Sequence, residues 1–435
     1  MSKRSVFAWL ILALLFVAGA ALYLAPRSLT GIPGAASLDF SPSSVGEITI
    51  TSPAWSREYH FAKADGQWRL RMPAPGQEPL DAPAWPVDAQ RLDAMMVLLR
   101  DRIEPAPDAS PGEPPASAIR VRLWAGNGPH QVHLEPLGPG GKAKVWVNGP
   151  SSRPQPAYVS REVRDLFDER AIRTWRTSVA LPDAQLGASR ITLQSGNQRV
   201  RLGQVQSRWG VVDPPLGPAD GASIAATLRT LAGLPIAAFE DDISPEDPQL
   251  AIDTPTAAIR LERDLRRADG DQSRAGVVVS ELLLGPLADV GGTHSLGVAS
   301  AWLEKPGDPR APLWGPLVVR IPADQLRPLK ADPLAYVSPL ALRTPAVEVQ
   351  SVTVTPPDAG PVRRFVRSSG AWSLDDARAS VADEKALNAL LILFTETPAA
   401  AVLKSVPDSA STLVLLEITA LDSSTPKRFT LRALE

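Results

Sequence analysis

The sequence predicts an α+β protein: one N-terminal transmembrane helix, followed by tandem small units that each combine an antiparallel sheet with a helix. Three observations support this fold class. An uncharged apolar run opens the chain, a pattern centred on Trp recurs three times, and a Leu-rich stretch headed by Asp follows each of these Trp residues. The predicted parts are a cytoplasmic tip and anchor at 1–27, a linker at 28–44, and units at 45–180, 181–343 and 344–435, the last one incomplete.

Composition narrows the functional classes. A chain of 435 residues is too long for one ordinary hydrophobic core. The 44 prolines divide it into short elements with many turns. A net charge of −2 gives no electrostatic signature for binding nucleic acid. Because the sequence contains no cysteine, thiol nucleophiles, thiolate metal sites and disulfides are excluded.

The apolar run at the N-terminus predicts the location of the protein. Val6–Leu24 is uncharged, and as a helix these 19 residues span about 28 Å, close to the hydrocarbon thickness of a bilayer. Lys3 and Arg4 precede the run, and basic flanks stay in the cytoplasm. The sequence therefore predicts a single-pass protein of the cytoplasmic membrane with most of the chain outside the cytoplasm, in the periplasm.

A cleaved signal peptide is the alternative for the same residues. Ala18, Gly19 and Ala20 would supply the small-residue cleavage site. The apolar core of a secretory signal is about 7–15 residues long, and this run is longer, which favours a retained anchor. The following residues 28–44 are rich in Gly, Pro and Ser and suit a tether.

Each of the three units is predicted to begin with a β-hairpin. A large apolar residue stands seven positions before the central Trp, a turn-forming residue two before it, and an apolar residue two after it. We therefore expect each Trp to anchor the second hairpin strand against a helix. The three sets are Phe61, Gly66, Trp68 and Leu70; Leu202, Ser207, Trp209 and Val211; and Phe365, Gly370, Trp372 and Leu374.

An Asp and an apolar stripe predict the helix. Apolar residues follow each Asp at positions +4, +8 and +11, which lie on one side of a helix with 3.6 residues per turn. An Asp directly before such a stripe is typical of an N-cap. The sets are Asp88 with Leu92, Met96 and Leu99; Asp220 with Ile224, Leu228 and Leu231; and Asp383 with Leu387, Leu391 and Phe394.

Short alternating runs after each helix predict further strands. In the first unit these are 119–124, 131–135 and 144–148; in the second, 258–262, 277–285, 300–304 and 317–321; in the third, 415–421 and 427–434. Short helices are predicted around 161–167 and 322–329.

Two groups of histidines suggest a possible metal site and a possible hydrolase site. His130 and His133, with Glu135, could suggest a metal pair, but residues three apart on a strand point to opposite faces, so a hairpin exterior is favoured. His294 and Ser295 suggest a hydrolase, but the nucleophile elbow requires a Gly where Thr293 stands. His60 is expected in a strand without a visible partner.

Other motifs also favour structural interpretations. Residues 138–144 (GPGGKAK) fail the phosphate-loop pattern and predict a hairpin turn. The acidic run at 239–247 lacks the Gly of a calcium loop and predicts a solvated loop, while 263–274 predicts an exposed or disordered mixed-charge loop. Outside the three repeated Trp positions, the aromatic residues that could form an exposed surface are Trp124, Trp146 and Trp302.

One family resemblance follows from these motifs. The stretch EITITSPAWSREYHFAKADGQWRLRMP (47–73), with its hairpin, Pro and Asp-headed helix behind an apolar N-terminus, resembles bacterial proteins carrying the domain of unknown function 4340. The resemblance is weaker in the second copy, where RWGV replaces GQW. It implies a membrane-anchored, extracytoplasmic protein, often encoded beside ABC-type transporter components of the gliding-motility type. It supplies no catalytic residues.

Two functional hypotheses follow. The first is a membrane-tethered scaffold or interaction protein with envelope or transporter partners. The second is an extracytoplasmic glycan- or peptide-binding module, or a hydrolase, that uses a cleft between units. No catalytic, cofactor-binding or metal-binding residue is assigned and no cofactor is expected, so enzymatic activity stays open, with a non-catalytic role preferred. The partner, any small-molecule ligand and the oligomeric state are not determined by the sequence.

Overall fold

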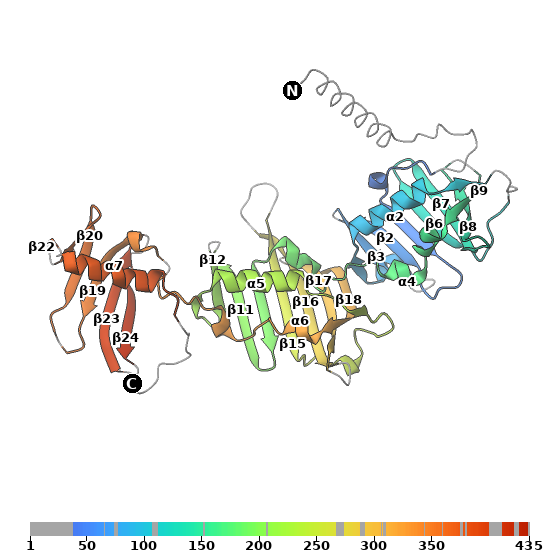
Figure 1. The fold of residues 1–435 in the computed structure, drawn as a ribbon. Helices are drawn as coiled ribbons and strands as arrows, with labels where there is room; N and C mark the ends of the chain where they lie inside the picture. Colours follow the sequence, from blue (N-terminus) through green and yellow to red (C-terminus); the bar gives the residue numbers. More distant parts are fainter. Residues whose placement is uncertain are drawn as a thin grey trace, which may run out of the picture. The chain divides into compact units, whose positions relative to one another are not determined.

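A computed structural model defines the fold (Figure 1). It describes residues 38–433 except 65, 74–76, 107–111, 151–152, 206–207, 267–273, 288–291, 306, 308–309, 343, 359, 375–376, 379–380, 400–410 and 422–425. Contacts between residues divide the chain into two compact units, Met1–Thr177 and Ser178–Glu435. The second unit contains two separate sheets, so the described residues form three sheets.

The first sheet is antiparallel and has nine strands. In order across the sheet they are β4 (Ala84–Pro86), β3 (Gln67–Arg71), β2 (Tyr59–Ala64), β1 (Glu47–Thr51), β6 (Ile119–Ala125), β7 (Gly128–Leu137), β8 (Lys142–Asn148), β9 (Gln155–Ser160) and β5 (Glu104–Pro105).

The second sheet is also antiparallel with nine strands, and its order repeats that of the first position by position. The strands are β13 (Gly217–Pro218), β12 (Arg208–Asp213), β11 (Gln198–Val205), β10 (Arg190–Ser195), β15 (Ala257–Arg266), β16 (Arg274–Leu287), β17 (His294–Glu304), β18 (Ala311–Pro322) and β14 (Ala238–Phe239).

The third sheet repeats the first six places of the same order. Its strands are β22 (Ala377–Arg378), β21 (Ala371–Leu374), β20 (Arg363–Ser368), β19 (Val349–Thr355), β23 (Ser411–Ala420) and β24 (Lys427–Ala433). β24 therefore takes the place that β7 has in the first sheet and β16 in the second.

Each sheet has one long helix with a buried stripe. These helices are α2 (Ala89–Asp101), α5 (Gly221–Ala232) and α7 (Val381–Thr395). The shorter helices are α3 (Arg161–Asp165), α4 (Glu169–Arg173) and α6 (Ala323–Leu326), and the 3₁₀ turns are η1 (Pro42–Ser44), η2 (Pro79–Asp81), η3 (Pro182–Leu186), η4 (Pro248–Leu250), η5 (Pro333–Tyr336) and η6 (Ala346–Glu348).

Two of the three predicted N-caps are confirmed. The Asp88 carboxylate accepts hydrogen bonds from the backbone N–H groups of Gln90 and Arg91, and Asp220 accepts one from Ser223. The prediction for Asp383 is wrong, because α7 begins two residues earlier and places this residue in its first turn. A carboxylate there still interacts favourably with the positive end of the helix dipole.

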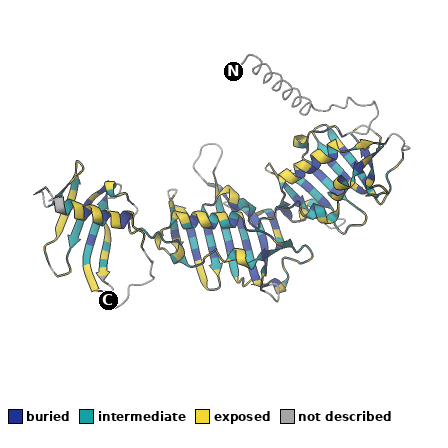
Figure 2. Ribbon diagram, in the orientation of Figure 1, coloured by how far each residue is buried: buried dark blue, intermediate teal, exposed yellow. Residues whose placement is uncertain are grey.

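The predicted hairpins are confirmed, and they share one register. Phe61 pairs with Leu70, Leu202 with Val211 and Phe365 with Leu374. In the first sheet these residues form one core with the stripe of α2, and the buried stripes alternate along the strands as Figure 2 shows. In the third sheet, the corresponding core joins Phe365 and Trp372 to the stripe of α7.

Burial of the central Trp is confirmed in two of the three hairpins. Trp68 and Trp372 have 3% and 2% of their surface exposed, but Trp209 is only partly buried, which corrects the expectation of three equivalent core sites. The residue opposite the Trp differs: Lys63 and Arg367 lie over the indoles of Trp68 and Trp372 at 4.9 and 4.6 Å, whereas Gln204 faces Trp209. A long cationic side chain covers the indole with its alkyl stem, and glutamine covers less of it.

The predicted fold class is wrong. The described chain is dominated by antiparallel sheet, with large sheets of nine, nine and six strands in place of small sheet-plus-helix units. Sequence reasoning underestimated the strands because it ended several of them too early; β16, for example, continues through Pro286. Among the described residues no helix is long and apolar enough to cross a membrane. The predicted N-terminal transmembrane helix and most of the linker lie outside the described residues.

Candidate functional site: the charged face of the second sheet

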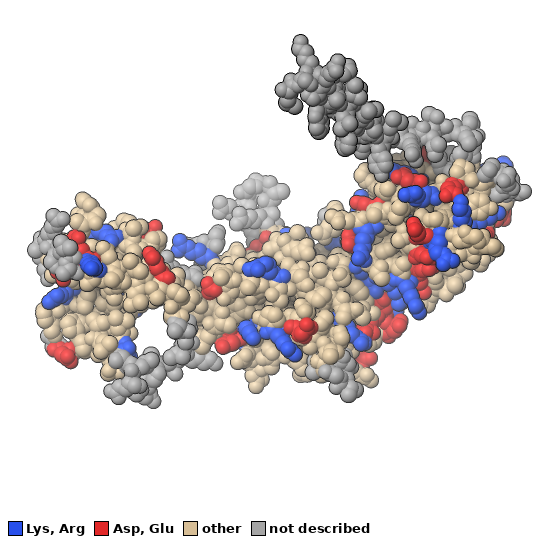
Figure 3. Space-filling model, in the orientation of Figure 1, with Lys and Arg blue, Asp and Glu red and all other residues tan. Residues whose placement is uncertain are grey.

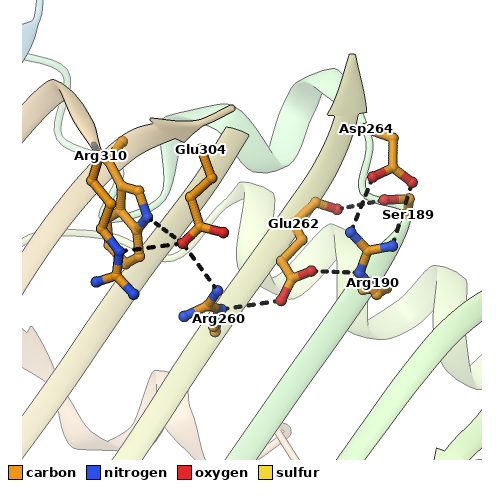
Figure 4. A network of polar contacts seen from close by, with 8 residues as sticks. Ser189, Arg190, Arg260, Glu262, Asp264, Glu304 and Arg310 are labelled. Carbon is orange, nitrogen blue, oxygen red and sulfur yellow. Dashed lines mark hydrogen bonds and ion pairs between the residues drawn. The ribbon is translucent and has the colours of Figure 1, made fainter. Parts of the chain in front are cut away.

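The second sheet has two chemically different faces because strand residues alternate. On β15, Ile259 and Leu261 are buried on the face that α5 covers, so Arg260, Glu262 and Asp264 lie on the opposite face. Pairing with the neighbouring strands brings further polar residues to these three. We call the resulting group the charged network; it consists of Arg190, Arg260, Glu262, Asp264, Glu304 and Arg310 (Figure 4).

Arg190 organises one half of the charged network. It lies on β10 directly opposite Glu262 on β15, and its Nε donates to that carboxylate. Its Nη2 donates to Asp264 at 3.0 Å, so one guanidinium binds two carboxylates. Ser189 adds a hydrogen bond from its hydroxyl to the Glu262 carbonyl at 3.0 Å. A planar guanidinium has several N–H donors and can therefore bind two carboxylates at once.

Glu304 organises the other half. One oxygen of its carboxylate lies 3.6 Å from Arg260 and 3.4 Å from Arg310. The same oxygen accepts a hydrogen bond of 2.8 Å from the indole N–H of Trp302. Both guanidinium groups lie over the Trp302 ring, at 5.5 and 4.9 Å from its centre. These contacts combine charge pairing with cation–π attraction.

The two halves meet at Arg260, which also binds Glu262 at 3.1 Å. Burial raises the pKa of Glu262, but hydrogen bonds and charge from Arg190 and Arg260 outweigh burial, so its pKa lies below the usual value. For Arg190, burial alone would lower the pKa, and the two carboxylates reverse this effect. Glu262 and Arg190 are therefore both charged at neutral pH.

Glu281 lies on β16 opposite Arg260, at the margin of the charged network. Burial raises its pKa; Arg260 and Arg310 lower it in part, and Glu304 raises it. A carboxyl with a raised pKa is one ingredient of acid–base chemistry. Glu281 and Glu262 lie on the same face of the sheet, and their pKa values are shifted in opposite directions.

The predicted histidine pair is not brought together. His130 is buried on the helix side of β7 and bonds Asn127 at 3.0 Å, whereas His133 pairs with Trp146 on the other face. The prediction that they point to opposite faces is confirmed, but the predicted hairpin exterior is wrong for His130, which is buried on the helix side. Burial lowers the pKa of both histidines. In the described ranges no three His, Asp or Glu side chains gather as a metal ion would need.

The other two histidines have local partners. His60 lies 2.9 Å from Glu47, and His294 lies 2.8 Å from the Thr293 hydroxyl at the start of β17. Ser295 is buried within an antiparallel strand. A nucleophile elbow instead places its serine on a turn from strand to helix.

The three stretches predicted as loops differ in the structure. Residues 138–144 include the turn between β7 and β8, as predicted, closed by a hydrogen bond of 2.9 Å from Gly138 to Lys142. In the acidic stretch at 239–247, Glu240 pairs with Arg320 at 2.6 Å, so part of this stretch is bound to the sheet. The mixed-charge stretch at 263–274 is not only a loop: its ends belong to β15 and β16, and its middle lies outside the described residues.

The additional Trp residues are covered by cations. Trp302 is 9% exposed beneath its two arginines, and Trp146 is 4% exposed with Lys144 at 4.6 Å from the ring centre. Trp124 has Arg122 at 5.1 Å. The expected exposed aromatic surface is therefore replaced by aromatic rings covered with charge. Sequence reasoning missed the charged network, although the alternation of charges in RLERD (260–264) was a usable signal.

A hollow of about 320 Å³ lies within the first unit; it is not the predicted cleft between units. Its lining includes Trp55, Arg57, Glu58 and Arg120. Glu58 is the only carboxylate among the lining residues, whereas glycoside hydrolysis uses a facing pair of carboxyl groups. This hollow does not supply that pair.

Comparison with known proteins gives no family assignment. No protein-family model matches the chain, and no curated protein matches it. The resemblance to proteins with the domain of unknown function 4340 therefore stays a prediction.

Proposed function

We propose that this protein is a non-catalytic interaction scaffold, held at the cytoplasmic membrane with its sheets outside the cytoplasm. In this proposal it joins envelope or transporter proteins in one complex. The apolar run at 6–24 and the family resemblance support the location and the transporter setting. The fold supports the scaffold role.

One observation supports the scaffold role. The strand order is repeated in the three sheets, but the side chains at equivalent surface positions differ. At the same register position, Glu47 faces Trp124 in the first sheet and Arg190 faces Glu262 in the second. In the third sheet, Ser351 faces Thr419. Tandem copies of one framework with different faces suit contacts with different partners, because function depends on the side chains that a fold displays.

Charge distribution agrees with protein recognition. On the face shown in Figure 3, basic and acidic residues are interspersed, without a broad field of one sign. Mixed charge of this kind favours specific protein contacts over binding to a polyanion.

A labelling experiment tests the location. The natural chain contains no cysteine, so a single Ser195→Cys substitution at an exposed strand end provides one reactive site. A membrane-impermeant maleimide should label it after the outer membrane is opened, whereas Ser2→Cys should react only after lysis. The reverse pattern would contradict the proposed location.

A second experiment tests the scaffold role. The full chain is solubilised from membranes in mild detergent, crosslinked, and analysed by mass spectrometry. We expect crosslinks from at least two of the three sheets to envelope proteins. Crosslinks confined to the chain itself, at native expression levels, would contradict the proposal.

A further inference from the structure

The third sheet has an open edge at a place where the other two sheets continue. β7 is followed across its sheet by β8 and β9, and β16 is followed by β17 and β18. β24 occupies the corresponding place, and in the part of the chain that the structure describes no strand pairs with its outer edge. Its backbone N–H and C=O groups on that side are available to another strand.

In the first and second sheets, the strands beyond β7 and β16 help to bury the helix-facing side chains of those two strands. On β7, the helix-facing residues Val132 and Leu134 are fully buried, and Leu282 on β16 is fully buried as well. The helix-facing residues of β24 are Phe429 and Leu431, which pair with Leu416 and Val414. Both pack against the core but are only partly buried. A neighbouring strand with apolar side chains on this face would complete their burial.

The charges of β24 specify the other face of such a strand. Arg428 and Arg432 lie on the face away from α7, whereas Lys427 pairs with the buried Ile418 and starts the strand on the α7 side. Arg428 pairs with Glu417 at 2.7 Å and keeps 73% of its side chain exposed. Arg432 is exposed and has no ion pair within the described residues. Carboxylates on an incoming strand would therefore find cations directly opposite.

The same charges disfavour a second copy of the chain as the occupant. Antiparallel pairing of two β24 strands about Thr430 places Arg428 of one copy opposite Arg432 of the other. Like charges directly opposite each other destabilise a strand pair. Cations on an edge strand are also a common defence against self-association.

We propose that β24 accepts an added antiparallel strand from a partner protein. The partner segment carries apolar side chains on the face toward α7 and Asp or Glu on the other face. Main-chain hydrogen bonds supply most of the affinity, and the alternating side chains supply the specificity. This inference rests on the proposed scaffold role and names one of its contact surfaces.

Synthetic peptides provide the probe. One peptide alternates valine with glutamate over the length of a strand, and its counterpart carries lysine in place of each glutamate. Binding to the full chain is measured by fluorescence anisotropy, and hydrogen exchange locates the protected amides. We expect the acidic peptide to bind more tightly, to weaken with salt, and to protect amides of β24.

Matched charge reversals test the edge. Arg428→Glu with Arg432→Glu should weaken binding of the acidic peptide by about tenfold or more, because two attractive contacts become repulsive. Arg363→Glu with Arg364→Glu changes the net charge equally on β20, away from the open edge, and should leave binding unchanged. An equal loss in both variants, or equal binding of the two peptides, would overturn the inference.

Hydrogen exchange measured without peptide distinguishes the other segments that could pair with the outer edge of β24. Protection of β24 that grows with protein concentration would identify a second copy, and concentration-independent protection would identify another segment of the same chain; either result overturns the proposal. If the peptide does not bind but the membrane crosslinks are found, only this inference fails. If the peptide binds and no envelope crosslinks are found, the proposed function fails instead.

Discussion

The first and second sheets have the same strand order, but the central Trp of their hairpins differs in burial. Trp68 is buried beneath Lys63, while Trp209 faces Gln204 and is half-buried. The second sheet instead carries the charged network on its other face. The same hairpin pattern and strand order therefore occur with different coverage of the central Trp and with different polar contacts on the two sheets.

The largest expected effect separates the two Trp residues. Trp68→Ala leaves a cavity beneath α2 and should reduce the free energy of local unfolding of the first sheet by about 3–5 kcal/mol. Trp209→Ala removes a partly buried ring and should cost the second sheet about 1 kcal/mol. Hydrogen exchange of the full chain, followed sheet by sheet, measures both values. Equal losses would mean that the two indoles have equivalent roles.

The second prediction concerns the charged network. Glu262→Gln leaves Arg190 and Arg260 with a weaker partner and should destabilise the second sheet by about 1–2 kcal/mol at pH 7, a value reduced for partial exposure. Because the folded-state pKa of Glu262 lies below the ordinary value of 4.5, the wild-type contribution is present above that pH. It is lost as the pH falls through the folded-state pKa.

The difference between wild type and Glu262→Gln should therefore shrink in acid. Hydrogen exchange of β10 and β15, corrected for the intrinsic effect of pH, measures this change. Glu417→Gln is the matched control, because its partner Arg428 is mostly exposed and the pair should contribute less than about 0.5 kcal/mol. A difference that stays constant with pH would show that ionisation of Glu262 is not the source of its contribution.

The third prediction compares the helix starts. Asp88→Ala and Asp220→Ala each remove a side chain that accepts backbone N–H bonds and should cost about 1 kcal/mol. Asp383→Ala removes a first-turn carboxylate, and loss of its interaction with the helix dipole should cost about 0.3–0.5 kcal/mol. Amide exchange in the first turns of α2, α5 and α7 distinguishes these values. A large effect at Asp383 would restore it as a cap.

The smallest expected effect exchanges the residues that face the indoles. Lys63→Gln should destabilise the hairpin of the first sheet by about 0.5 kcal/mol, and Gln204→Lys should stabilise that of the second by a similar amount. Exchange of the amides in β2, β3, β11 and β12 measures both changes. If neither variant has an effect, the cation does not explain the difference in Trp burial.

Local periodicity predicted the hairpins and the long helices well, because their apolar positions repeat within a few residues. It did not predict β5 or β14, which have two residues each and form only against distant strands. The charged network was missed for a related reason. Its members come from β10, β15, β17 and a following loop, and only cross-strand register brings them together.

The sequence by itself determined where the hairpins turn, where two of the three helix caps lie, and that one pattern occurs three times. Each of these depends on contacts between residues close in the chain. Only the tertiary structure decided that the units are large antiparallel sheets, that Trp209 is only partly buried, and that charges gather on one face of the second sheet. Those outcomes depend on which distant strands pair with each other. Alternation of residues along one strand predicts its two faces, but it does not predict which strand lies beside it.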